Sequence, residues 1–142
     1  MMPRLFRESP INAIWEGSGN VQCLDVLRAV RRAPVCLEAY FAELNKARGA
    51  DAALDAHVTA LGRELRDVND LEYRARDIVD RMALAIPAAL LVQDAPHVVS
   101  DAFCRSRLTP AGHRNYGALP RGVDCRGIIA RAWSSPGPSG AP

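Results

Sequence analysis

The sequence predicts an all-α protein, an antiparallel helical bundle with short connections. Two observations support this fold class. Apolar residues recur every three or four positions between Gly and Pro breakpoints along most of the chain, which is the spacing of one helix face. The sequence shows neither the strict apolar–polar alternation of a half-buried strand nor an internal repeat. Short segments between the periodic stretches favour antiparallel neighbours.

The first predicted helix follows the turn at residues 17–20. Asn20 is its expected N-cap, because the side chain can accept a hydrogen bond from the free amides of the first turn. Pro34 ends this helix or starts the next one. The apolar face consists of Val21, Leu24, Leu27 and Val30.

A second helix is predicted from Pro34 and a third from Asp51. Gly49 is the expected C′ residue that closes the second helix. The apolar stripe of the second helix is Leu37, Tyr40, Phe41 and Leu44, and that of the third is Leu54, Val58, Leu61 and Leu65.

A fourth helix is predicted to open at Asn69, because Asn69 and Glu72 have the spacing of a capping box. Pro87 lies deep in this segment and predicts a kink. The helix is expected to end near residues 94–96. Its apolar face is Leu71, Ala75, Ile78, Met82 and Ile86.

The last third of the chain predicts two shorter helices. One covers residues 97–108, with Val98, Val99, Ala102 and Phe103 facing inward. Residues 109–122 form a loop, and Asp124 caps a final helix that holds Ile128, Ile129, Ala132 and Trp133. Residues 134–142 contain only Ser, Pro, Gly and Ala, so we expect a disordered tail. The predicted organisation is one helical domain, residues 1–133, and the tail.

Composition excludes several classes of protein. The chain has 142 residues, the length of one ordinary domain, and 18 basic residues against 16 acidic ones give a net charge of +2. That balance excludes a protein whose whole surface binds nucleic acid. The longest apolar run, residues 82–92, is too short to span a membrane, and the N-terminus has no signal-peptide pattern. With 4 scattered cysteines and no CxxC, we expect a cytoplasmic protein with reduced thiols.

The most unusual stretch is residues 9–20, where Glu16 lies between a tryptophan and a Gly-Ser-Gly turn. Gly17 and Gly19 allow a ligand to approach the backbone closely, and the amides near Ser18 and Asn20 could hold an anion or a carbonyl oxygen. Trp15 would partly desolvate the Glu16 carboxylate and raise its pKa toward that of a usable base. The alternative is that Glu16 only complements the helix dipole.

Other chemistry has weaker support. The three histidines, His57, His97 and His113, lack metal-ligand spacing, and we expect no metal site. Arginine clusters could neutralise phosphates, or they could form a solvated face paired with nearby acids. The clusters are Arg28, Arg31 and Arg32, then Arg74, Arg76 and Arg81, and in the last third Arg105, Arg107, Arg114, Arg121, Arg126 and Arg131.

Residues 2–28 closely resemble the C-terminal helical domain of acyl-CoA dehydrogenases. The sequence Trp-Glu-Gly-Ser-Gly-Asn at residues 15–20 is similar to the alkylation-response, AidB-like branch of that family, where ordinary members have Tyr-Glu-Gly-Thr. Residues 101–108 and 117–124 look like a late helix and the final loop of the same branch. The resemblance covers about residues 2–133.

The resemblance implies a flavin enzyme that oxidises an acyl-CoA thioester. FAD accepts a hydride from Cβ while a carboxylate removes the Cα proton. Glu16 matches the catalytic base of many members. Ser18 and Asn20 match positions that touch the flavin dinucleotide, together with the backbone at Gly17. Trp15 matches a bulky residue beside the flavin that narrows the acyl pocket.

The sequence also departs from the family. A full member has an N-terminal helical domain and a middle β-domain that hold most of the flavin and thioester contacts, and this sequence contains neither. We therefore expect little activity from the isolated chain, because the cofactor carries the electrons. The expected partners are the missing domains or a chain that supplies them, a second copy through exposed apolar faces, or DNA through the C-terminal helices. The alternative to an enzyme is a non-catalytic DNA-binding or oligomerisation module.

Overall fold

The computed structural model describes residues 2–13, 15, 18–109 and 117–132. Within these ranges every regular element is helical, which confirms the predicted all-α class. The predicted tail, residues 134–142, lies outside the described residues, as does Trp133. The elements are α1 (Met2–Glu8), the 3-10 helix η1 (Ser9–Ala13), α2 (Gly19–Arg32), α3 (Pro34–Asn45), α4 (Ala52–Arg66), α5 (Ala75–Asp94), α6 (His97–Arg107) and α7 (Cys125–Ala132).

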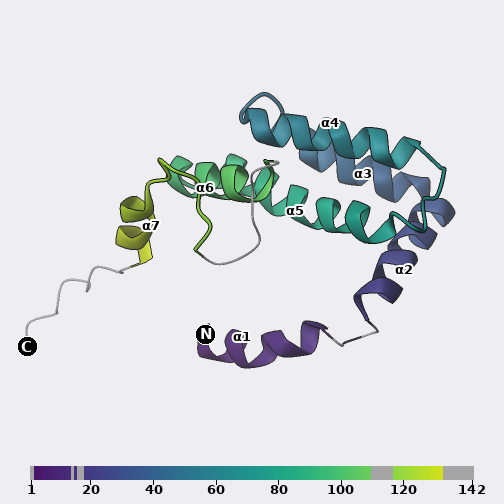
Figure 1. Ribbon diagram of the computed structural model, residues 1–142, viewed down its shortest axis with the longest axis horizontal. Coiled ribbons are helices and arrows are strands. Elements are labelled where there is room, and N and C mark those ends of the chain that lie inside the picture. Colours follow the sequence, from purple (N-terminus) through teal and green to yellow (C-terminus); the bar gives the residue numbers. More distant parts are fainter. Residues whose placement is uncertain (1, 14, 16–17, 110–116, 133–142) are drawn as a thin grey trace, which may run out of the picture.

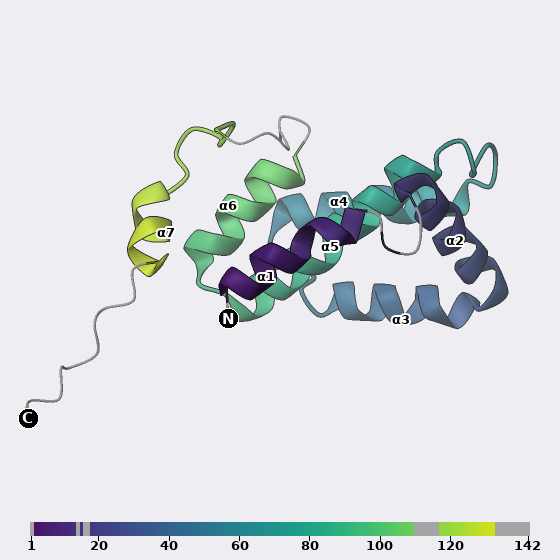
Figure 2. The same cartoon turned by 90° about the horizontal axis from the view of Figure 1, so that it is seen from below.

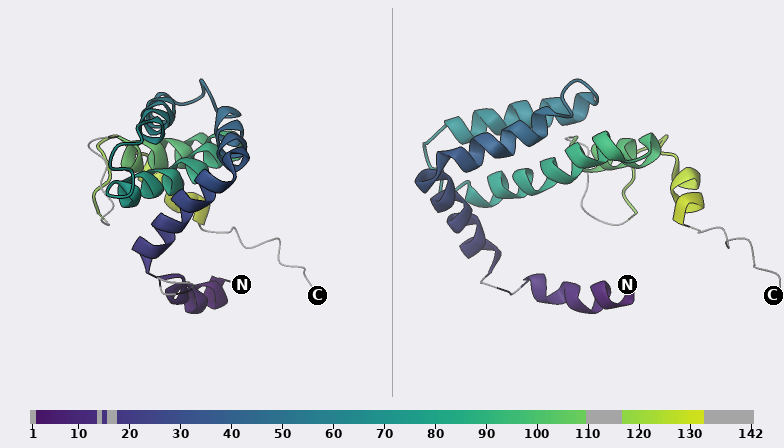
Figure 3. Two further views of the ribbon diagram at one scale, coloured as in Figure 1. Left: turned by 90° about the vertical axis from the view of Figure 1, so that its right-hand side faces the viewer. Right: turned by 180° about the vertical axis from the view of Figure 1, so that it is seen from behind.

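The longest helix, α5, is the centre of the bundle. It packs against α2, α3, α4 and α6, and α7 packs against α6. Figure 1 shows α3 and α4 together on one side of α5, with α6 following it. Seen from the end, α3 and α4 lie side by side above α5 and α6 (Figure 3). This arrangement lets one helix, α5, contribute to most of the buried interior.

The helices before residue 14 lie away from the bundle. Figures 1 and 3 show α1 separated from α5 and connected to α2 through the turn. The sequence analysis predicted no helix here, because a seven-residue helix is shorter than the window in which helical periodicity can be detected. The apolar side chains of Leu5, Phe6 and Ile11 are exposed, Phe6 at 79%.

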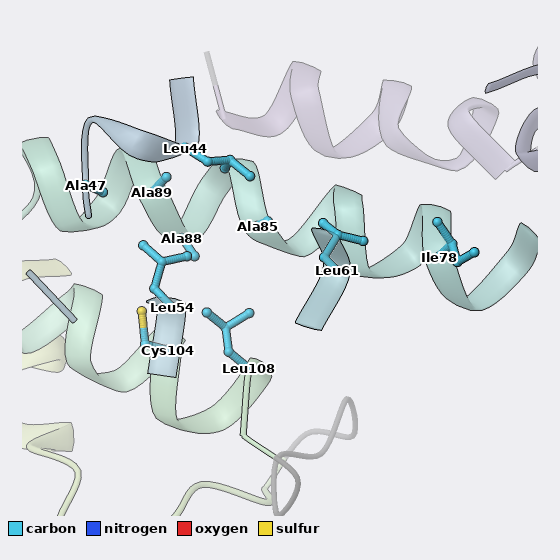
Figure 4. Close-up of a cluster of buried hydrophobic side chains, with 10 residues drawn as sticks. All are labelled: Leu44, Ala47, Leu54, Leu61, Ile78, Ala85, Ala88, Ala89, Cys104 and Leu108. Atoms are coloured by element: carbon cyan, nitrogen blue, oxygen red, sulfur yellow. The ribbon is translucent and has the colours of Figure 1, made fainter. Parts of the chain in front are cut away.

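The main hydrophobic core lies where α3, α4 and α6 meet α5. Figure 4 shows alanines on one face of α5 with larger side chains from the other helices directed toward them. The predicted stripes are confirmed at Leu44, Leu54, Leu61 and Ile78, all of them buried. The full buried set is Leu44, Ala47, Leu54, Leu61, Ile78, Ala85, Ala88, Ala89, Cys104 and Leu108. A second, smaller cluster of Cys23, Leu27 and Ala75 joins α2 to α5.

The predicted helix start near Asp51 and the predicted cap at Asp124 are confirmed. The Asp51 carboxylate accepts a hydrogen bond from the Leu54 amide at 2.9 Å and is the N-cap of α4. The Asp124 carboxylate accepts one from the Gly127 amide at 2.9 Å and starts α7. The predicted role of Gly49 is wrong. Helix α3 already ends at Asn45, and Gly49, with φ of +83°, lies in the turns that follow.

The predicted capping box at Asn69 and Glu72 is also wrong. Helix α5 starts at Ala75, and residues 69–74 form turns. Asn69 instead donates hydrogen bonds from its backbone and side-chain nitrogens to the Asp67 carboxylate, at 3.0 and 2.9 Å. Arg74 crosses this connection: its guanidinium donates to the Glu64 carboxylate at 2.5 Å and to the carbonyl oxygens of Asp67 and Asn69. A tertiary arginine contact therefore replaces the expected local cap.

Helix α5 continues through Pro87 to Asp94. Just before Pro87, side chains from two neighbouring helices reach its backbone. His57 Nε2 on α4 lies 3.0 Å from the Arg81 carbonyl oxygen, and the Tyr40 hydroxyl on α3 donates to the Met82 carbonyl oxygen at 2.9 Å. These contacts give His57 a structural role.

Candidate functional site

The candidate site is the turn that leads into α2. Trp15 follows η1, its backbone amide donates to the Ile11 carbonyl oxygen at 2.9 Å, and its side chain is 62% exposed. Glu16, the predicted catalytic base, and Gly17 lie outside the described residues. Gln22 on α2 donates from Nε2 to the Trp15 carbonyl oxygen at 3.0 Å. This bond ties the residue before Glu16 to the helix after it.

The structure corrects the position of the helix cap. Ser18, with an extended backbone, is the N-cap of α2, and its side chain makes no capping hydrogen bond. The predicted N-cap, Asn20, is instead the second residue of the helix. The first helical bond here runs from the Gln22 amide to the Ser18 carbonyl oxygen, 3.1 Å. The amides of residues 19–21 therefore point out of the helix end without helical acceptors.

A residue that sequence reasoning did not assign to the site, Arg76, lies against this helix start. Its Nη1 donates to Asn20 Oδ1 at 2.8 Å. A Cβ added to Gly19 would lie 2.7 Å from the same nitrogen, so a side chain at this position would displace the guanidinium, the mobile end of the arginine. Arg76 is 56 positions from Asn20 in sequence. No local motif could have identified it, and only the packing of α2 on α5 brings the two together.

A pocket of about 300 Å³ opens beside this contact, between the start of α2 and the start of α5. Its polar lining residues are Asn20, Arg76 and Glu72, whose carboxylate pairs with Arg31, and Tyr73 is 92% exposed. A hollow of this size is at the lower end of the range for small-molecule sites. Its lining is completed by Cys23, Leu24, Glu72 and Ala75.

Free amides at a helix start next to a guanidinium suit an anionic, phosphate-bearing group. The dinucleotide of FAD is such a group, and at position 19 it would meet the guanidinium of Arg76, which lies over the glycine. The residues present therefore fit the phosphate part of the implied cofactor. The described residues around the turn are exposed, so the remainder of a flavin site would have to come from other polypeptide.

The other candidate groups do not form a site in the described part of the chain. No cluster of three or more His, Cys, Asp or Glu able to hold a metal is found there. All four cysteines are free thiols, as expected; Cys23 and Cys104 are buried, while Cys36 and Cys125 are exposed. Burial raises the pKa of the Cys104 thiol to about 12, with further contributions from Asp51 and Asp101. Cys104 is therefore an unreactive core residue.

Five of the clustered arginines, Arg28, Arg31, Arg74, Arg81 and Arg105, are paired with acids in the described part of the chain. Arg31 bonds Glu72 at 3.0 Å, and Arg81 and Arg105 bond acids one turn earlier, Asp77 and Asp101. Arg28 likewise pairs with Asp25. Such pairing reduces the positive field that phosphates would meet, so at these five arginines the contacts favour the solvated-face interpretation. Arg114 lies outside the described residues.

None of the helices in the described ranges has the length and apolar content needed to cross a membrane.

Fold and site together define a helical bundle that presents an anion-compatible helix start beside an exposed tryptophan. Comparison with models of protein families finds no match, and no solved structure matches the chain. Among curated proteins, the chain is similar to the Escherichia coli (strain K12) protein named "Putative acyl-CoA dehydrogenase AidB", with 33% identity over 111 residues. The match covers 78% of this chain and 20% of that protein, so the chain spans about one fifth of the relative's length.

Proposed function

We propose that this chain is the C-terminal helical part of a flavin-dependent acyl-CoA dehydrogenase of the AidB type. The observation that carries the proposal is the similarity to the E. coli relative along 78% of the chain. The helix start at Ser18, with its outward amides and the nearby guanidinium of Arg76, is compatible with a phosphate-bearing cofactor.

In this proposal Glu16 is the catalytic base. A carboxylate is the group that would remove the weakly acidic α proton of a thioester. Trp15 limits the width of the acyl pocket. The amides at Gly17 and Ser18 and the side chain of Asn20 hold the cofactor. A bound FAD supplies the acceptor for the hydride that leaves Cβ.

The rest of the flavin and thioester site would come from polypeptide outside this chain. The exposed apolar side chains of Leu5, Phe6, Ile11 and Trp15 are suited to contact it. The isolated chain is accordingly expected to show no turnover.

The test combines the full chain with the remaining four fifths of the E. coli relative as a separate polypeptide. Flavin absorbance reports binding, and exchange of the thioester α proton for deuterium reports the base without requiring hydride transfer. Glu16→Gln should leave flavin bound and slow exchange by about 1,000-fold. Glu8→Gln, a change to an exposed carboxylate paired with Arg4 on α1, is the matched control. Undiminished exchange in Glu16→Gln removes Glu16 from the mechanism.

A second candidate function is self-association without catalysis. The same exposed apolar side chains favour it, Phe6 above all at 79% exposure. Sedimentation of the chain separates the two candidates. A concentration-dependent dimer that Phe6→Ser dissolves, with no flavin bound in either preparation, supports self-association over the enzyme.

A further inference from the structure

Helix α3 lies at the margin of the bundle and is apolar on almost every side. Figure 2 shows it running along one edge of the molecule. Only Glu38 and Glu43 among its 12 residues are charged. Yet Leu44 is its one buried residue, and Val35 is 65% exposed. A helix that is apolar all round is normally covered on all sides, so α3 has more apolar surface than its own chain covers.

A groove runs between α3 and α4 on the side away from α5. Its volume is about 540 Å³, within the range of binding sites. At its centre Gly62 has no side chain, and a Cβ built there would lie 3.9 Å from the Phe41 ring. The apolar side chains that line the groove are Pro34, Leu37, Phe41, Val58 and Leu65. An apolar ridge on another helix would fit this groove.

The exposed side of α3 presents such a ridge. Val35, Ala39 and Ala42 recur at the spacing of one helix face, and all three are exposed. Around the helix, Glu38 lies between this ridge and Phe41 of the groove. Ridge and groove are therefore neighbouring surfaces of one helix pair.

This arrangement is self-complementary. If a two-fold axis runs parallel to α3, the ridge of each copy enters the groove of the other, and α3 is enclosed by α4, α5 and two helices of the second copy. An unrelated helix in the groove would leave the ridge uncovered. A second copy of this chain is the occupant that covers both surfaces in one contact.

The charges at the groove match the same arrangement. Glu38 and Arg66 line one end of the groove, and neither has an ion pair within the part of the chain that the structure describes. The charged residues of α3 are all acidic, whereas the last turn of α4 carries Arg63 and Arg66. With the axis parallel to the helices, Glu38 of the second copy stands level with Arg66. Two such pairs form, one in each groove.

We propose that α3 is the centre of a symmetric dimer, in which α3 of a second copy lies in the groove between α3 and α4. This interface goes beyond the proposed function and needs neither flavin nor thioester. It is also separate from self-association through α1, because Phe6 does not line the groove.

Sedimentation of the full chain from about 1 to 200 μM tests the dimer. The wild-type chain should form dimers, and Val35→Arg should raise the dimer dissociation constant at least about tenfold, because a guanidinium then faces apolar side chains. Ile129→Arg, at a position of α7 that is 59% exposed, is the matched control and should leave the constant unchanged. Urea denaturation checks that both variants fold. A wild-type chain that stays monomeric throughout overturns the proposal.

Charge reversal tests how the two copies meet. Glu38→Arg and Arg66→Glu should each raise the dissociation constant by about tenfold, because like charges then face each other across the interface. Asp94→Arg, the same change of charge at the exposed end of α5, is the control. Mixing the two single variants should restore association to within about threefold of wild type, because each chain supplies the charge that the other lacks. A mixture that associates no better than its components overturns this seating of α3.

Other occupants of the groove give different results. If Phe6→Ser abolishes the dimer and Val35→Arg does not, the association runs through α1. If the chain is monomeric and Val35→Arg weakens its binding to the remaining four fifths of the E. coli relative, that polypeptide covers α3. Either result overturns the dimer through α3. Failure to bind flavin in the reconstitution rejects the proposed function and leaves the sedimentation result unchanged.

Discussion

The Tyr40 hydroxyl donates a hydrogen bond to the backbone carbonyl oxygen of Met82 at 2.9 Å. It joins α3 to α5 one turn before Pro87, and the ring packs at the edge of Phe41, with centroids 5.4 Å apart. Tyr40→Phe keeps the ring and removes the bond, so it should lower the free energy of unfolding by about 1 kcal/mol. Urea denaturation measures this. Tyr73→Phe, at a site 92% exposed, is the control and should leave the free energy of unfolding unchanged.

Leu61 is the most deeply buried large side chain of α4, with no exposed surface. Leu61→Ala removes its contacts with α5 and leaves a cavity, so the free energy of unfolding should fall by about 3 kcal/mol. Val68→Ala, at a position 76% exposed, is the control and should leave the free energy of unfolding almost unchanged. A loss below about 1 kcal/mol for Leu61→Ala would mean that α4 packs differently.

Arg74 stabilises the connection between α4 and α5. Its guanidinium donates hydrogen bonds to the Glu64 carboxylate and to the carbonyl oxygens of Asp67 and Asn69. Its side chain is 24% exposed. Arg74→Ala should destabilise the fold by about 2 kcal/mol, because the partly buried Glu64 loses its partner. Arg74→Lys should recover little, since an ammonium cannot reach three acceptors in the same fork geometry. Arg63→Ala, on the exposed side of α4, is the control in thermal denaturation.

Cys104 predicts a loss of stability at alkaline pH. Burial raises the pKa of its thiol from 9.0 to about 12. Between these values the unfolded chain has lost the proton and the folded chain has kept it, so folding becomes less favourable as pH rises. Stability should therefore be constant up to about pH 9 and then fall, by at most about 1.4 kcal/mol per pH unit from this group.

Cys104→Ala removes that titration. Its unfolding free energy should depend less steeply on pH between 9 and 10 than that of the wild-type chain. The comparison is of slopes, because the substitution also removes buried volume. Burial raises the pKa of Tyr40 as well, so some decline above pH 10 should persist in the variant. An identical slope in both proteins would show that the thiol already titrates normally in the folded state.

Much of the bundle could be predicted from local patterns. The stripes at Leu54, Leu61 and Ile78 are set by helical spacing, and the cap at Asp51 depends on an amide only three residues away. The errors occur where another contact takes the place of the expected cap. Asn69 has capping-box spacing, but its polar groups bond to Asp67 and Arg74. Helix α5 starts at Ala75 instead.

In the candidate site, too, some features are visible in the sequence and others depend on packing between helices. The turn at residues 15–20 stands out in the sequence because tryptophan, acid and glycines occur together. Asn20 looked like a cap because its residue type fits that role locally. Its actual partner, Arg76, comes from another helix, and one-dimensional spacing carries no information about such a pair. The role of Glu16 remains a prediction from resemblance.

The alanine face of α5 has a consequence for comparing sequences. Ala85, Ala88 and Ala89 have no exposed surface, so methyl groups set how closely the neighbouring helices approach. Enlarging any of them to valine or leucine would force the helices apart, at a cost of about 1–3 kcal/mol. A related chain can keep this interhelical spacing only if it keeps small residues there. The Ala-x-x-Ala-Ala pattern is thus a marker by which chains with the same close-packed axis can be recognised, even where the surrounding leucines have drifted.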